Sequence, residues 1–149
     1  MNLTRSLVKV GTVAIKAGSS ALAKLTNAAL IIVSGRFLTV AAADLPALTG
    51  FNVPANTWGL CFFAVNASGT VTPYFAVNAG SFSSVSGNPG YSLNLAVPVQ
   101  VPADQVILGG LYVGAGATAF TGGTTALDAG TYTFGFFDGM GQVQPVGHV

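Results

Sequence analysis

The chain of 149 residues is long enough for one domain with a hydrophobic core. Only 6% of its residues are charged, against roughly 25% in ordinary globular domains, and 51% are hydrophobic. A free monomer with so few charges has little electrostatic repulsion to keep it soluble. We therefore expect much of the surface to be buried against further copies of the chain or a partner. A stable β protein coated with Ser, Thr, Asn and Gly is the alternative.

The charges are divided unevenly along the chain. All five basic residues lie in the first 36 positions, whereas all four acidic residues, which are Asp, come later. The basic residues are Arg5, Lys9, Lys16, Lys24 and Arg36. This division predicts an extended basic N-terminal arm, residues 1–27, whose positive charge, together with Arg36, docks on an acidic partner surface.

The same charges exclude two classes of partner. A nucleic-acid interface clusters Lys and Arg on one face with aromatic or polar readers between them, and the basic residues here are too sparse for that. No uncharged apolar run reaches the roughly 18 residues of a membrane-spanning helix. We therefore expect neither a nucleic-acid partner nor a membrane partner.

The first elements expected in chain order are extended. Residues 1–27 alternate weakly between apolar and polar positions, so they read as an arm or a strand, although a helix over 19–27 is also possible because Ala and Leu are good helix formers. Two apolar runs, 29–33 and 36–40, flank the dipeptide Ser34-Gly35. This pattern predicts a β-hairpin.

A central hairpin is predicted around the polar turn Asn66-Ala67-Ser68-Gly69. The strand before the turn, 58–65, is apolar at both alternating sets of positions. We therefore expect both of its faces to be covered. The strand after the turn contains Pro73, which cannot donate a ladder hydrogen bond and indicates either an edge position or a bulge at that point.

The remaining segments also read as strands and turns. Residues 80–90 read as a surface loop, and residues 93–101 alternate cleanly, with Pro98 indicating an edge. Further strands are expected at 105–113 and 131–137. About seven or eight short strands separated by Gly and Pro turns predict an all-β domain over 28–149, arranged as a β-sandwich or jelly roll.

Residues suited to catalysis or metal binding do not cluster in the sequence. The four Asp residues are scattered beside turns, where Asp side chains usually bond the backbone. His148 is the single histidine, and Cys61, the single cysteine, lies in an apolar strand and reads as a buried small hydrophobe. Residues 114–119 match G-x-G-x-x-A, but no helix is expected after them. We therefore expect no enzymatic activity, no cofactor and no metal.

The aromatic residues divide between strands and loops. Those in strands, such as Phe62 and Phe134, are expected to build the core. Those in loops are candidates for partner contacts. These candidates are Phe51, Phe82, Tyr91 and Phe120. Exposed loop aromatics would also suit a module that binds a receptor or a glycan.

Three segments resemble a family of small structural proteins found in tailed bacteriophages. They are 38–50 (LTVAAADLPALTG), 62–71 (FFAVNASGTV) and, most specifically, 120–128 (FTGGTTALD). The resemblance covers roughly residues 28–140, although 130–140 is more aromatic than the family pattern. It implies a virion component, assembled in the host cytoplasm, with no catalytic residues to carry over.

Within that class, the resemblance implies head decoration, as a cement protein that binds the major capsid protein or other virion proteins. A tail, collar or fibre component that binds a receptor or a glycan is the alternative. Such proteins also form homo-oligomers, of which a cyclic trimer is one option.

Overall fold

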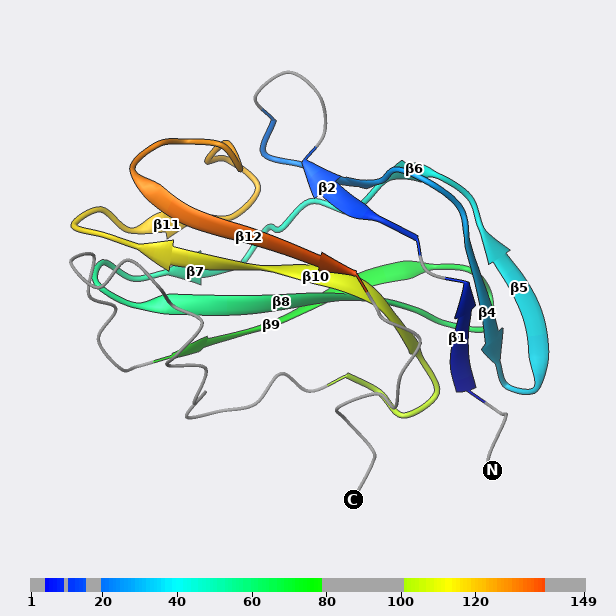
Figure 1. The fold of residues 1–149 in the computed structure, drawn as a ribbon. Helices are drawn as coiled ribbons and strands as arrows, with labels where there is room; N and C mark the ends of the chain where they lie inside the picture. Colours follow the sequence, from blue (N-terminus) through cyan, green and yellow to red (C-terminus); the bar gives the residue numbers. More distant parts are fainter. Residues whose placement is uncertain (1–4, 10, 16–19, 79–100, 139–149) are drawn as a thin grey trace.

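The computed structural model describes residues 5–9, 11–15, 20–78 and 101–138 (Figure 1). These ranges contain twelve strands and no helix, so the all-β prediction is confirmed. The strands form four antiparallel sheets of four, three, three and two strands.

The four-stranded sheet is the largest, with the strand order β12-β10-β8-β9. Its members are β8 (Trp58–Val65), β9 (Val71–Asn78), β10 (Val106–Ala115) and β12 (Tyr132–Asp138). β8 and β9 form the predicted hairpin. Its turn closes because Asn66 Oδ1 accepts hydrogen bonds from the backbone N–H groups of Ser68 and Thr70, at 2.9 and 3.0 Å. Pro73 lies in β9 at the end of the strand order, which confirms its predicted edge position.

Strand β8 is covered on both faces, as its sequence predicts. One alternating set, which includes Cys61 and Phe63, belongs to the main core and is 0% exposed. On the opposite face, Ala64 is buried with Val101 and Ile107, and Leu60 and Phe62 pack partly buried against them. The register of β8 with β10 shifts between Ile107 and Gly109, which marks a β-bulge.

A three-stranded sheet has the order β1-β4-β5. Its members are β1 (Arg5–Lys9), β4 (Ala29–Val33) and β5 (Arg36–Val40). β4 and β5 form the second predicted hairpin, with Val33 opposite Arg36. The turn residues Ser34 and Gly35 have φ values of 50° and 74°, and positive φ at both central positions is the requirement of a type I′ turn.

Two small sheets complete the described fold. β2 (Val13–Ile15), β3 (Ala23–Leu25) and β6 (Ala43–Asp44) form one, in the order β2-β3-β6. β7 (Asn52–Val53) and β11 (Phe120–Thr121) form the other. The helix considered over 19–27 is wrong, because residues 23–25 are a strand held between two neighbours. Pairing with neighbouring strands has overridden the local helix propensity.

The expected separation of an N-terminal arm from the domain is not confirmed. β1 pairs with β4, and β2 pairs with β3. Val13 is buried in the main core, and its N–H donates a 2.9 Å hydrogen bond to Asp138 Oδ1 at the end of the last described strand. The sandwich or jelly-roll arrangement is likewise not confirmed, because the strands divide among four sheets around the main core. The loop expected at 80–90 and most of the strand expected at 93–101 lie outside the described residues.

Candidate interaction surface

The basic residues are spread over two sheets. Arg5 and Lys9 lie on β1, and Arg36 is exposed at the start of β5. Since Val33 of β4 is paired with Arg5 on one side and Arg36 on the other, these two arginines occupy one row of the three-stranded sheet. Lys24 is half-buried on β3, opposite Asp44 of β6. Lys16 lies outside the described residues.

Two of the four loop aromatics are core residues, so their prediction as partner contacts is wrong. Phe51 and Phe120 are both 0% exposed. Their ring centroids are 5.9 Å apart, and the ring of Phe120 also packs edge-on against Phe134 at 5.8 Å. The short β7–β11 pair explains this burial, because it holds Phe120 beside the segment that directly follows Phe51. Phe82 and Tyr91 lie outside the described residues.

A different aromatic residue is exposed. Phe37 on β5 has an exposed fraction of 71%, and no other large hydrophobic side chain among residues 11–13, 20–77 and 101–138 is exposed. Along β5, Leu38 and Val40 pack against the main core, whereas Phe37 and Thr39 point to the opposite face. The sequence of the hairpin already contains this alternation, which could have indicated that Phe37 is exposed although it lies in a strand and not in a loop.

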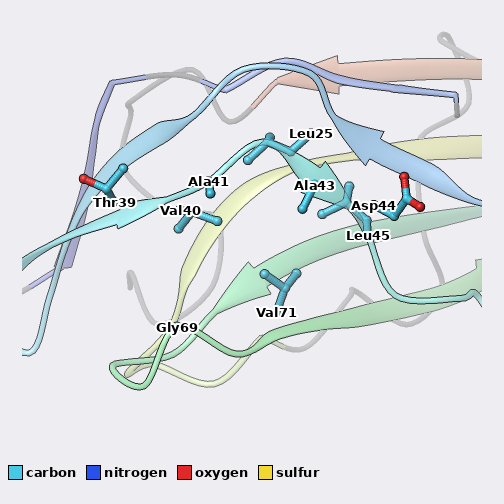
Figure 2. Close-up of a pocket in the computed structure, with 9 residues that line it drawn as sticks. All are labelled: Leu25, Thr39, Val40, Ala41, Ala43, Asp44, Leu45, Gly69 and Val71. Carbon is cyan, nitrogen blue, oxygen red and sulfur yellow. The ribbon is translucent and has the colours of Figure 1, made fainter.

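A pocket of about 250 Å³ lies next to this strand, between the chain that follows β5 and the β8–β9 turn (Figure 2). Most of the lining is aliphatic. The lining residues are Leu25, Thr39, Val40, Ala41, Ala43, Asp44, Leu45, Gly69 and Val71. Thr39 and Asp44 lie toward opposite ends of the lining, as Figure 2 shows. The pocket is therefore suited to a small apolar group.

The residues considered for chemistry are not brought together where the structure describes them. In those ranges no group of three or more His, Cys, Asp or Glu side chains is placed to hold a metal ion. Cys61 is buried, and its desolvation raises the pKa of the thiol far above its ordinary value. The G-x-G-x-x-A match, 114–119, begins in β10 and ends directly before β11, so a two-residue strand follows it and the expectation of no helix there is confirmed. His148 lies outside the described residues.

Comparisons with known proteins give no relative. No protein-family model, no curated protein and no solved structure matches the chain. Among the residues described, no helix is long and apolar enough to cross a membrane. The features that remain as evidence for function are therefore the composition of the chain and its surface around β5.

Proposed function

We propose that this chain is a non-enzymatic structural protein of a virion, and that it decorates the phage head as a cement protein. The observation that carries the proposal is the apolar surface at β5, where Phe37 is 71% exposed in a chain with only 6% charged residues. Exposed apolar side chains on an open strand edge are typical of protein–protein interaction sites. The resemblance of three sequence segments to phage structural proteins is the reason for proposing a virion as the assembly.

The mechanism of such a protein is physical. A protein that binds only where capsid subunits meet stabilises the assembled shell by mass action, because dissociation of the shell must first remove it. Phe37 would supply apolar contact area to the major capsid protein. The neighbouring Arg36, which is exposed and leaves β5 on the opposite face from Phe37, would face an acidic patch at the rim of that contact.

The alternative, a tail, collar or fibre module that binds a receptor or a glycan, has less support. It relied on exposed loop aromatics, and Phe51 and Phe120 are buried. The other two candidates, Phe82 and Tyr91, lie outside the described residues.

The copy number of the chain in purified virions tests the proposal. Quantitative mass spectrometry would compare it with the major capsid protein in the same particles. A copy number comparable with the capsid subunit supports decoration of the head. A few to a few tens of copies would overturn decoration in favour of a tail, collar or fibre component, and absence from virions would overturn the virion function altogether.

A further inference from the structure

Strand β5 is an edge strand that has little of the usual protection beyond its first residue. It ends the order β1-β4-β5, and among the described residues no strand pairs with its other side. Natural edge strands avoid pairing with other chains by being very short, by carrying charged residues (especially Lys) or Pro, or by bulging. In β5, RFLTV, the only charge is Arg36 at the first position. The four residues after it are uncharged and include no Pro, and the register with β4 runs without a bulge from Arg36 to Val40.

The turn geometry identifies which backbone groups of β5 face outward. In a hairpin with a two-residue turn, the residues that flank the turn, here Val33 and Arg36, form a hydrogen-bonded pair. Antiparallel pairs then alternate, so Leu38 and Val40 also bond to β4. The N–H and C=O groups of Phe37 and Thr39 consequently point away from β4 and form the free edge.

The side chains beside this edge are apolar. Phe37 and Thr39 are exposed on the outer face of the sheet, opposite Ile32 and Leu30 of β4, which are only half-buried. A strand added to β5 would therefore gain backbone hydrogen bonds at the edge and apolar contacts on this face.

We infer that this edge binds a second copy of the same chain, through antiparallel pairing of the two β5 strands about a two-fold axis at Leu38. In this register Phe37 of each copy lies opposite Thr39 of the other, so every outward N–H and C=O group of both residues is paired. Leu38 lies opposite Leu38 of the second copy. The two three-stranded sheets become one continuous six-stranded sheet.

Charge and side-chain geometry favour a second copy as the occupant. Arg36 is the single charged residue of β5, and this register places it opposite Val40 of the second copy rather than opposite another arginine. The two Phe37 rings become diagonal neighbours, a separation of roughly 7–8 Å that aromatic side chains span. The contact is self-complementary, as a two-fold interface requires. It produces a dimer rather than the cyclic trimer that the resemblance suggests, and it does not depend on a virion function.

Sedimentation velocity of the purified full-length chain, over a wide concentration range, tests this inference. Phe37→Lys places a charge in the contact, and Thr39→Pro removes an outward N–H that the β4–β5 ladder does not use. Thr118→Lys is the matched control, because it adds the same charge at an exposed residue of the loop after β10, far from β5 (Figure 1). Circular dichroism would verify that each variant is folded.

We expect the wild type and Thr118→Lys to form dimers that dissociate on dilution. Phe37→Lys and Thr39→Pro should each raise the dimer dissociation constant by about tenfold or more. A wild type that stays monomeric at every concentration, or that forms trimers, would overturn the inference. Dimerisation that both edge variants leave unchanged would do the same. If Thr39→Pro fails to fold, Phe37→Lys alone decides between these results.

Discussion

The edge strands β9 and β5, which belong to different sheets, differ in how far they are protected against pairing with another chain. Each ends the order of its sheet. In the β8–β9 hairpin the Asn66 N–H donates a 3.1 Å hydrogen bond to the Thr70 carbonyl, so these two residues form a hydrogen-bonded pair. Hydrogen-bonded and non-hydrogen-bonded pairs alternate along the ladder. The pair of Pro73 with Phe63, three residues further along, is therefore non-hydrogen-bonded. The nitrogen of Pro73 therefore faces outward, where its missing N–H costs the ladder nothing and gives an incoming strand no donor. β5 has no equivalent residue.

Phenylalanine side chains near the two edges have different environments. Phe63, on the strand next to β9, is fully buried, whereas Phe37, on β5 itself, is 71% exposed. The large sheet is protected at this edge by proline, and the smaller sheet presents an apolar face and an open edge. Of these two edges, β5 is therefore the one suited to association.

Truncating the two phenylalanines gives the largest expected contrast. Phe63→Ala should lower the free energy of unfolding by about 3–5 kcal/mol, because it removes a fully buried ring and leaves a cavity. Phe37→Ala should change it by less than about 0.5 kcal/mol, as at other exposed positions. Urea unfolding at a concentration where the protein is monomeric measures both, and equal losses would contradict the assignment of Phe37 to the surface.

Proline at neighbouring positions of β5 tests the direction of the backbone groups. Leu38→Pro should cost about 3 kcal/mol or more, since it removes a ladder hydrogen bond to β4 and a side chain that packs on the core. Thr39→Pro, which copies the protection of β9, should cost less than about 1 kcal/mol. The difference in urea midpoints is the measurement. A larger loss for Thr39→Pro would reverse the assignment of inward and outward groups.

The buried thiol of the large sheet predicts a pH dependence. Burial raises the pKa of Cys61, whereas in the unfolded chain a thiol loses its proton above about pH 8.5. Its contribution to stability is therefore complete below pH 8.5 and is lost as the pH rises, by about 1.4 kcal/mol per pH unit. Urea unfolding under reducing conditions from pH 7 to 10 should show a steeper decline for the wild type than for Cys61→Ala. Parallel declines would mean that the thiol is not buried.

The turn that presents β5 gives the smallest effect. Ser34 has a φ value of 50°, and Asn adopts positive φ more readily than Ser. Ser34→Asn should therefore raise the free energy of unfolding by about 0.5 kcal/mol, measured as a higher urea midpoint. A loss of stability would show that the turn is not of the type I′ class.

Local patterns predicted much of this fold. Structure is specified within a few residues by Ser34-Gly35, by the Asn66 turn and by the apolar alternation of β8. Pro73 indicated that its strand lies at an edge, because proline lacks an N–H. The exposed surface at β5 was also encoded locally, in the opposite directions of Phe37 and Leu38.

Pairings between distant segments were not predictable in the same way. Phe51 and Phe120 are buried because two-residue strands 67 positions apart in sequence pair with each other, and no local pattern reports such a contact. The arm was expected from the charge distribution alone, which contains no information on the pairing of β1 with β4 or of β2 with β3. The charge of a segment indicates which partners it can attract, but the pairing of its strands determines its position in the fold.

Disulfide cross-linking of Leu38→Cys is the sharpest test of the pairing of β5 with itself. The two-fold register places this position opposite its own copy in a non-hydrogen-bonded pair, where Cα atoms are about 4.5 Å apart and a disulfide can form. Thr39→Cys is the control, because its copies are only diagonal neighbours, and both variants would carry Cys61→Ala. Mild oxidation should convert Leu38→Cys, but not Thr39→Cys, into a reducible covalent dimer. Failure of Leu38→Cys to cross-link, or faster cross-linking of Thr39→Cys, would contradict this pairing.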